Sequence, residues 1–324
     1  MNPITNHVGT SAPAKIILFG EHFVVYNKPA ILASIDKRVH VDVSVRNDNK
    51  IVIKSNMGFG GSFDEKKRKQ LQTKSFKSLV QPILLAVTDT MEEFNASVGL
   101  DLNIRSEFPY GVGLGSSAAC SVAIIAAVGT LFGKLNRKKI CNISLNAEKL
   151  VHRNPSGADS AICSYGGLIL FNKNNNMKSI NSDIDLELIV INSGIKRTTG
   201  KLVSNVKQKF ERDADMFMDL ANTSENITIQ ALKAIKDKDY DELGALMTLN
   251  HSLLYKLGVS KNILDKLVEI ALHNGALGAK ITGGGGGGCI IVLTNKHFKN
   301  KIMKEMKGYE TFVSKVERDG VIIK

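Results

Sequence analysis

The chain contains few of the residues that mark secreted or metal-binding proteins. Its 324 residues include no tryptophan and only four cysteines. These cysteines show neither CxxC spacing nor a neighbouring histidine, which excludes a zinc-binding pattern and favours reduced thiols in a cytoplasmic protein: Cys120, Cys141, Cys163 and Cys289. The first ten residues lack both a basic start and an apolar run, so we expect no signal peptide.

A hydrophobic run long enough to cross a membrane is also missing. The most apolar stretch, residues 118–133, is shorter than the roughly 18 to 20 residues that a span requires. It includes Ser121 and Thr130 and follows directly on a glycine-rich loop. We therefore predict a buried core helix here and no membrane partner.

Acidic residues are outnumbered by basic ones. The chain has 43 Lys and Arg against 31 Asp and Glu, a formal net charge of +12, which favours an anionic partner: a phosphorylated small molecule, a nucleic acid or a membrane surface. Aromatic residues make up only 6%, and no basic patch with interleaved aromatics occurs, which argues against nucleic acid. A nucleic-acid-binding protein remains the alternative from another class.

The hydrophobic content of 43% is sufficient for a large core, and the length predicts two domains. Apolar patterns predict strands at residues 14–20, 39–45, 51–53, 100–104, 168–171, 186–192, 278–282 and 289–293. They predict helices at residues 75–93, from 116 onward, at 144–153, several between 201 and 255, and at 262–274, followed by a basic helix and a last strand. Polar residues predict loops at 64–69, 134–139 and 172–176. We place the domain boundary at 185, which gives units of residues 1–185 and 186–324.

The sequence PYGVGLGSSAA, residues 109–119, joins a predicted strand to the apolar helix. Glycines let backbone N–H groups approach a ligand, and a helix N-terminus adds unpaired donors, so the loop suits a phosphate. A tight turn with a serine cap is the alternative interpretation. No GxxxxGK[ST] occurs, and the basic residues 134–139 follow where a dinucleotide fold would place an acidic residue, which disfavours both common phosphate folds.

Three ordered motifs resemble those of the GHMP kinases. Residues 109–119 resemble their second motif, which wraps the triphosphate of ATP. Residues 14–26, AKIILFGEHFVVY, resemble the first motif, and residues 280–289, KITGGGGGGC, resemble the third. Together the motifs extend over nearly the whole chain.

Further segments resemble the mevalonate kinases within this group. They are residues 148–159 (EKLVHRNPSGAD), residues 193–199 (SGIKRTT) and residues 250–260 around Asn250 and Leu257. The third motif usually reads TGAGGGGC, whereas this chain has Gly284 in place of alanine, and we expect a slightly looser loop.

The resemblance implies an α+β fold of two domains. The N-terminal domain is expected to be similar to ribosomal protein S5 domain 2 and the C-terminal domain to be ferredoxin-like, with the active site in the cleft between them. The implied reaction is ATP-dependent phosphorylation of the 5-hydroxyl of (R)-mevalonate in the cytoplasm, a step toward isoprenoids. Another GHMP kinase, acting on phosphomevalonate or on a different hydroxyl of mevalonate, is the alternative. Dimers occur in the family, and no feature of this sequence demands one.

The resemblance also assigns the nucleotide site. The expected ATP contacts are Pro109, Gly111, Val112, Gly113, Leu114, Gly115, Ser116, Ser117, Ala118 and Ala119. The glycines expected to support this loop are Gly283, Gly284, Gly285 and Gly286. Ser117 and Glu148 are expected to bind Mg²⁺, because they offer the hard oxygen ligands that this ion prefers.

Asp159 is expected to be the general base toward the acceptor hydroxyl, with Lys15 beside it to stabilise the developing negative charge. Without the resemblance, Asp159 reads as a helix cap, Lys15 as a surface lysine and the glycine run as a flexible linker.

The remaining expected contacts are to mevalonate itself. The resemblance assigns a hydrogen bond to His22, with Glu21 as its neighbour, although His22 alone reads as a core histidine. It places Arg197 at the acid end of mevalonate and Thr199 at the hydroxyl end. An arginine fork is well suited to a carboxylate.

Overall fold

The computed structural model describes the chain except for residues 65–73, 152–154, 174–176 and 198. The described strands are β1 (His7–Phe19), β2 (Ala30–Arg46), β3 (Lys50–Ser55), β4 (Gly61–Asp64), β5 (Gly99–Ser106), β6 (Leu168–Phe171), β7 (Lys178–Ser179), β8 (Glu187–Asn192), β9 (Gly278–Ile281), β10 (Cys289–Leu293), β11 (Glu310–Lys315) and β12 (Ile322–Ile323). The described helices are η1 (Phe23–Tyr26), α1 (Lys74–Glu93), α2 (Ser116–Phe132), α3 (Arg137–Val151), α4 (Ala158–Tyr165), α5 (Thr199–Arg212), α6 (Ala214–Asp237), α7 (Tyr240–Leu257), α8 (Asn262–His273) and α9 (Lys296–Glu305). Most of the charged loop predicted at 64–69, the end of the helix predicted at 144–153 and part of the turn predicted at 172–176 lie outside the described residues.

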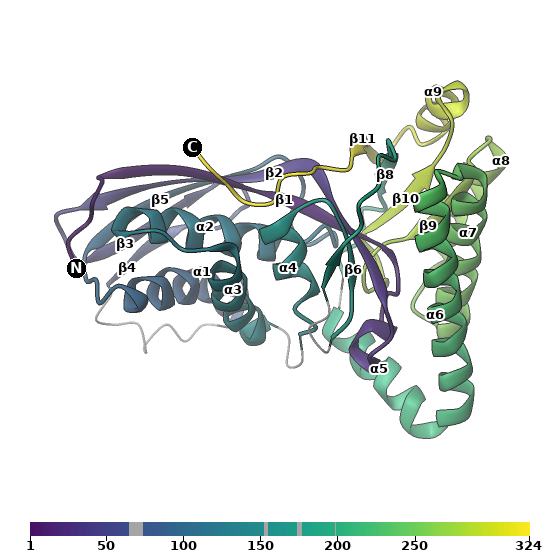
Figure 1. Ribbon diagram of the computed structural model, residues 1–324, viewed down its shortest axis with the longest axis horizontal. Helices are drawn as coiled ribbons and strands as arrows, with labels where there is room; N and C mark the ends of the chain where they lie inside the picture. The colour runs from purple at the N-terminus through teal and green to yellow at the C-terminus, as the bar shows by residue number, and fades with distance from the viewer. Residues whose placement is uncertain (65–73, 152–154, 174–176, 198) are drawn as a thin grey trace.

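Two sheets divide the molecule into two parts (Figure 1). The described strands of the larger sheet have the order β12-β1-β2-β5-β3-β4, and β6 pairs with the start of β2 and with β7. Its strands are antiparallel except β3 and β5, which run parallel. The smaller sheet has the antiparallel order β11-β8-β10-β9. This arrangement confirms the predicted α+β class.

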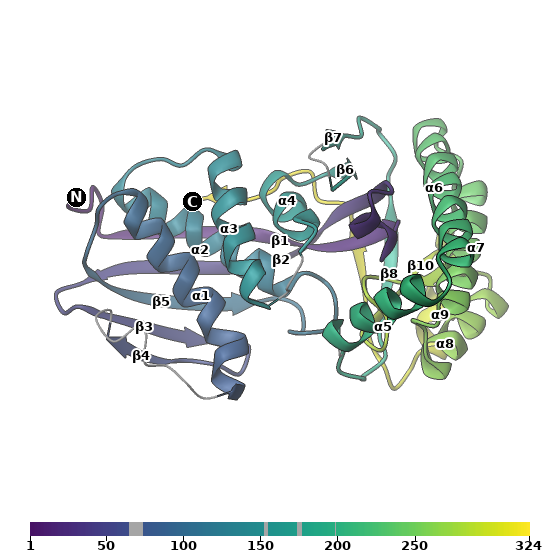
Figure 2. The same ribbon diagram turned by 90° about the horizontal axis from the view of Figure 1, so that it is seen from below.

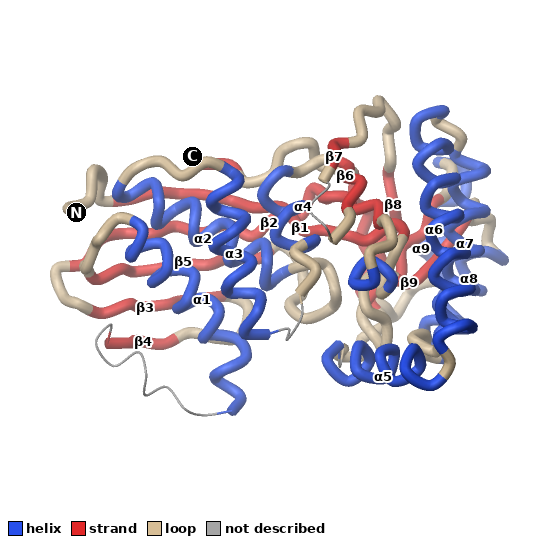
Figure 3. Tube along the Cα trace, turned by 60° about the horizontal axis from the view of Figure 1, so that its bottom comes forward, coloured by secondary structure: helices blue, strands red, loops and turns tan. Residues whose placement is uncertain are grey.

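Helices cover one face of each sheet. In Figures 1 and 2, α1, α2 and α3 lie together against the larger sheet, and α2 contacts both β1 and β2. In the smaller sheet α7 and α8 pack on β9, with α6 beside α7 (Figure 3). Each sheet therefore buries its apolar face under helices of its own part of the chain.

Helix α2 is the centre of the larger core. Nearly all of its residues are buried, because it lies between the sheet and α1 and α3. The hydroxyl of Thr10 on β1 donates to the carbonyl oxygen of Ala123 at 2.8 Å, which joins the helix to the sheet. The prediction of a buried core helix at 118–133 is confirmed, and among the described helices none is long and apolar enough to span a membrane.

Strands β1 and β2 are longer than the sequence predicts. The predicted strands began at residues 14 and 39, whereas β1 begins at His7 and β2 at Ala30. Because of Thr10 and Ser11, the start of β1 has a polar sequence that does not predict a strand. Both residues are nevertheless buried and hydrogen-bonded. Their polar atoms are satisfied by distant segments, which the local pattern does not show.

Helix α3 also begins earlier than predicted. Residues 137–139, expected to form part of a basic turn, make its first turn instead. The side-chain oxygen of Asn136 accepts a hydrogen bond from the backbone N–H of Lys139 at 2.9 Å. An asparagine at this position caps the helix, so the basic residues can continue it.

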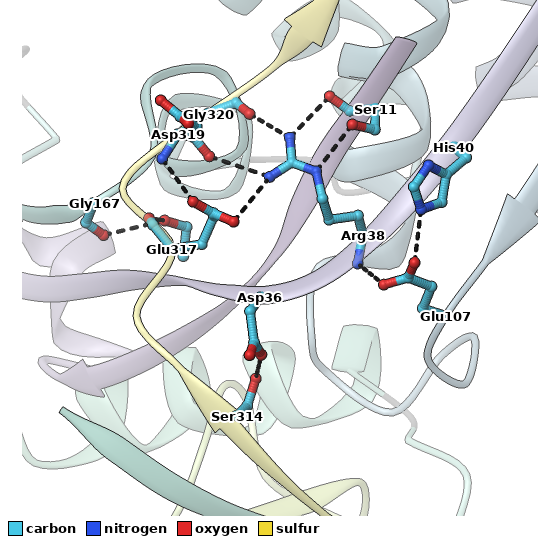
Figure 4. A network of polar contacts seen from close by, with 11 residues as sticks. Ser11, Asp36, Arg38, His40, Glu107, Gly167, Ser314, Glu317, Asp319 and Gly320 are labelled. Atoms are coloured by element: carbon cyan, nitrogen blue, oxygen red, sulfur yellow. Dashed lines mark hydrogen bonds and ion pairs between the residues drawn. The ribbon is translucent and has the colours of Figure 1, made fainter. Parts of the chain in front are cut away.

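The C-terminal segment returns to the larger sheet. Its last strand, β12, pairs with β1, and Arg38 of β2 holds the residues before it (Figure 4). The guanidinium of Arg38 donates to the carbonyl oxygen of Gly320 at 2.6 Å and to Ser11, and it lies 3.6 Å from the carboxylate of Glu317. The second sheet begins at Glu187, close to the predicted boundary at 185, but the end of the range 186–324 thus joins the first part of the fold.

Candidate active site

The loop between β5 and α2 has the geometry of an anion-binding turn. Gly111, Gly113 and Gly115 all have positive φ angles, of 80°, 98° and 75°. Gly115 is the N-cap of α2, and no side chain caps the helix. The alternative of a serine cap is therefore wrong: the hydroxyl of Ser116 accepts instead from the N–H of Gly111 at 3.3 Å. The first N–H groups of α2 stay available to an anion.

Lys15 and Asp159 come together beside this loop. The backbone N–H of Lys15, on β1, donates to the carbonyl oxygen of Leu114 at 2.9 Å. Its ammonium lies 2.7 Å from Oδ1 of Asp159. The lysine side chain is only 4% exposed, whereas the aspartate is 31% exposed, so the carboxylate is the partner that a ligand can reach.

Asp159 lies in the first turn of α4, a helix that the sequence analysis did not predict. Gly157 caps this helix with a φ of 81°, and again no side-chain cap is present. Asp159 is therefore not the capping residue that the residue-only interpretation suggested. A helix this short is stabilised by its packing on α2 and α3 rather than by its own residues. The local sequence therefore gives little indication of it.

Glu148 of α3 is the second carboxylate at this site. The hydroxyl of Ser160 donates to it at 3.1 Å and also lies 2.9 Å from the hydroxyl of Ser144. Burial, together with the negative charge of Asp159, raises the pKa of Glu148 from 4.5 to about 8. Lys15 opposes this shift only in part. Without a further cation nearby, the neutral form of Glu148 is therefore favoured at neutral pH.

Ser117 has a tyrosine as its neighbour. Its side chain makes a hydrogen bond with Tyr110, whose pKa is raised to about 12, mainly by burial. Tyr110 and Ser160 were not among the predicted site residues. Tyr110 lies within the second motif and Ser160 directly follows Asp159, and these positions were the sequence signals for a place in the site.

Arg197 lies between the two glycine-rich segments. A Cβ atom on Gly113 would stand 2.1 Å from its Nη1, and one on Gly283 would stand 3.0 Å from the same atom. Its Nε is buried without a hydrogen-bond partner among the described residues. Burial lowers the pKa of Arg197, and the negative charge of Asp159 opposes that shift. A buried guanidinium that lacks a partner calls for an anionic ligand.

The glycine run is a turn between two paired strands. β9 and β10 are antiparallel neighbours, so the flexible-linker interpretation is wrong. The N–H of Gly286 donates to Val259 at 2.8 Å and that of Gly288 to Ile195 at 2.9 Å. A Cβ on Gly288 would stand 2.3 Å from the carbonyl oxygen of Val112, so the run lies directly against the loop before α2.

His22 contacts the same run. Its Nε2 lies 3.0 Å from the carbonyl oxygen of Gly284, and because a carbonyl only accepts, this nitrogen carries the proton. Burial lowers the pKa of His22 from 6.5 to about 4, so the ring is neutral. Its φ of 63° is unusual for a residue with a side chain.

The carboxylate of Glu21 is buried inside the protein. One oxygen accepts from the ammonium of Lys280 and the other from the amide of Asn250 at 3.1 Å. The side chains of Glu21 and Lys280 are both 0% exposed. A lysine inside the apolar strand GAKI was the sequence signal for such a buried partner.

Thr199 begins helix α5, and its side chain lies outside the described part of the structure, as does Thr198 beside it. Thus Lys15, Asp159, Glu148 and Arg197 form one charged cluster, next to both glycine-rich segments. His22 joins the cluster through Gly284.

Comparison with known proteins identifies the family. Residues 79–167 match the model of the GHMP kinases N-terminal domain, and residues 231–309 match that of the GHMP kinases C-terminal domain. The mevalonate kinase of Thermococcus sibiricus is 36% identical over 97% of this chain and 97% of its own length. The mevalonate kinase of Methanothermobacter thermautotrophicus is also 36% identical, over 87% of this chain and 88% of its own.

Solved structures agree with this assignment. The structure of Methanococcus jannaschii mevalonate kinase has a TM-score of 0.85 and 27% identity, and the match covers 97% of this chain and 100% of that one. The structure of L. major mevalonate kinase in complex with R-mevalonate has a TM-score of 0.84 and 26% identity, and it covers 98% of both chains. The resemblance seen in the three motifs is confirmed: the chain belongs to the GHMP kinases, and within them to the mevalonate kinases.

Proposed function

We propose that this chain transfers the γ-phosphoryl group of ATP to the 5-hydroxyl of (R)-mevalonate, giving 5-phosphomevalonate and ADP. The observation that carries the proposal is the 2.7 Å contact between Lys15 and Asp159. It brings a carboxylate and an ammonium to the side of an uncapped glycine-rich helix N-terminus. Phosphoryl transfer requires this combination of a phosphate cradle, positive charge and a group that orients the acceptor.

Each predicted group has a distinct task in this reaction. Asp159, the more exposed partner of the pair, orients the acceptor hydroxyl and takes its proton. Lys15 stabilises the developing charge on the acceptor oxygen and the γ-phosphoryl group. Backbone N–H groups of the loop 109–115 and the first turn of α2 bind the phosphates of ATP.

Mg²⁺ fits the donor set of Ser117 and Glu148. Within the described residues no three His, Cys, Asp or Glu side chains form a metal site. Mg²⁺ commonly takes only one or two protein oxygens and completes its shell with phosphate and water. Burial and the nearby Asp159 raise the pKa of Glu148, so a bound cation would favour its ionised form. When bound, the ion would neutralise charge on the phosphates.

The anionic end of the acceptor is assigned to Arg197. Its buried Nε lacks a partner, and the guanidinium lies beside Gly113 and Gly283. A carboxylate is a geometrically matched ligand for such a fork. The resemblance adds Thr199 at the hydroxyl end and His22 as a hydrogen-bonding contact, and both assignments stay proposals.

The function is tested with purified protein, Mg-ATP and three acceptors in a coupled assay for ADP. Mevalonate should support turnover, with 5-phosphomevalonate and homoserine giving little, and ³¹P NMR of the product should show a monoester at C5. A reaction without acceptor controls for ATP hydrolysis. Turnover with either competing acceptor but none with mevalonate would exclude the proposal.

Two further expectations stay proposals: a cytoplasmic location, which the cysteine pattern favours, and a homodimer, which rests on the resemblance alone. Light scattering after size-exclusion chromatography measures the mass directly. A mass near the 35.2 kDa of one chain would exclude the dimer under those conditions.

A further inference from the structure

A buried polar brace joins β9, α7 and the segment after β1, and its members have no task in the proposed reaction. It consists of Lys280 on β9, Glu21 in the segment after β1, and Asn250 on α7. All three side chains are buried, and the side chains of Lys280 and Glu21 are 0% exposed. None of these side chains is therefore open to direct contact with a ligand.

Every donor of the Lys280 ammonium is used inside the protein. It donates to Glu21, to the carbonyl oxygen of Ile281 at 2.8 Å and to that of Ile17 at 3.3 Å. The second oxygen of Glu21 accepts from Asn250. A buried ion pair tolerates its desolvation only when the remaining polar atoms are satisfied in this way.

The brace joins the two parts of the fold where both contribute to the site. Ile17 follows Lys15 by two residues on β1. Its backbone N–H donates to the hydroxyl of Thr282, just after β9, at 3.0 Å. Lys280 lies just before the glycine run. Thus the strand that carries Lys15 and the run that contacts the loop before α2 are held together by the same few bonds.

Glu21 directly precedes His22, which has an unusual positive φ. Such a conformation is sparsely populated and persists only where the surroundings fix it. Before His22 the chain is fixed by the carboxylate of Glu21, and after it by the fully buried ring of Phe23. The imidazole is thereby directed to the carbonyl oxygen of Gly284.

We infer that Lys280 and Asn250 are positioning residues: by holding Glu21 they fix His22 against the glycine run and keep the acceptor site in register with Lys15. The effect on catalysis rests on the proposed function, whereas the effect on His22 does not. In this role Glu21 acts on the substrate only through its neighbour.

The test replaces the ion pair by neutral groups of similar size, Glu21→Gln with Lys280→Met. Removing both charges together avoids an unpaired buried ion. The matched control is Glu187→Gln with Lys299→Met, a pair at 2.8 Å that is remote from the cluster. Circular dichroism first establishes that each variant is folded.

The first readout is the pKa of His22, followed by NMR in histidine-labelled protein without substrate and assigned with His22→Gln. The folded double variant should titrate well above the value of about 4 and toward 6.5, since the ring is released from its buried contact. A merely stabilising ion pair would leave this pKa unchanged in the folded protein. The control double variant should also leave the pKa of His22 unchanged.

The second readout is kcat/KM for mevalonate, which should fall about tenfold or more while the affinity for ATP is retained. A folded double variant with an unchanged His22 pKa and unchanged kcat/KM overturns the inference. If the double variant does not fold, Asn250→Ala replaces it, with smaller changes of the same sign expected and no change in either readout overturning the inference. Lack of activity on mevalonate in the wild-type protein would defeat the proposed function alone, because the His22 titration is read without substrate.

Discussion

Among single residues, the carboxylate of Asp159 is the group with the most direct expected effect on turnover. Asp159→Asn keeps the shape of the side chain but cannot take a proton, so turnover should fall by about 100- to 10,000-fold. The affinity for ATP should be nearly unchanged, because the phosphates are proposed to bind the loop before α2 and not Asp159. Coupled ADP assays and nucleotide titrations measure the two effects. Asp183→Asn, an exposed residue outside the cluster, is the control, and near-normal turnover of Asp159→Asn would remove the base role.

Replacement of Glu148 should change both the stability of the metal-free protein and the Mg²⁺ requirement of the reaction. Its pKa is about 8 in the folded protein and 4.5 ordinarily, so its contribution to stability is lost as the pH rises between these values. Glu148→Gln should therefore raise the melting temperature of the metal-free protein at about pH 9. It should also raise the Mg²⁺ concentration for half-maximal activity by about tenfold or more, or about 1.4 kcal/mol. The exposed Glu269→Gln is the control, and an unchanged Mg²⁺ requirement would contradict the assignment.

His22 should make the protein sensitive to acid. Its folded pKa of about 4 is below the ordinary 6.5, so the unfolded chain binds the proton first and stability is lost as the pH falls between these values. The loss should be on the order of 2–3 kcal/mol. Urea unfolding at several pH values measures it. His22→Gln should flatten this dependence and the exposed His297→Gln should not; equal slopes in both variants would be the contrary result.

At the scale of elements, the glycine run contains positions that require glycine for its positive φ and one position that does not. Gly284, where the family has alanine, is the residue of the run 283–288 without a positive φ. The neighbouring Gly285 has a φ of 69°, and a Cβ there would stand 2.2 Å from the carbonyl oxygen of Val259. The looser loop expected from the glycine at 284 is countered by hydrogen bonds to Val259 and Ile195.

These positions predict opposite effects of one substitution. Gly284→Ala should keep or raise the free energy of unfolding, by about 0.4–1 kcal/mol, because it restricts the unfolded chain at a position whose φ is not positive. Gly285→Ala should lower it by more than about 1 kcal/mol through strain and contact. Urea denaturation of both variants makes the comparison, and equal costs at the two positions would show that the run is not held as described.

For the whole molecule, the return of the C-terminal segment is the feature with the largest expected stability effect. Arg38→Met removes the guanidinium that binds Ser11, Glu317 and Gly320 and should cost at least about 3 kcal/mol. Arg46→Met, on the same strand, removes a more exposed pair with Asp48 and should cost much less than Arg38→Met. Chemical denaturation measures both, and similar small losses would show that the segment contributes little.

The family, the α+β class and the core helix α2 could all be predicted from the sequence. Motifs at fixed places in the chain indicate the family and, through the resemblance, the fold class, whereas apolar patterning predicts the helix; both signals are local properties. It also pointed to Lys15, Glu148, Asp159 and Arg197, which the structure brings into one cluster.

Only the tertiary structure decided which contacts those residues make. Some elements form only because of partners far away in the chain: the start of β1, helix α4 and the C-terminal strand β12. Their own residues therefore do not show the hydrophobic periodicity that predicts a strand or a helix. The same holds for Glu21: its motif suggested a substrate contact, whereas the structure gives its oxygens to Lys280 and Asn250. A buried charge is satisfied by whatever the fold places beside it, and that placement is not a property of neighbours in sequence.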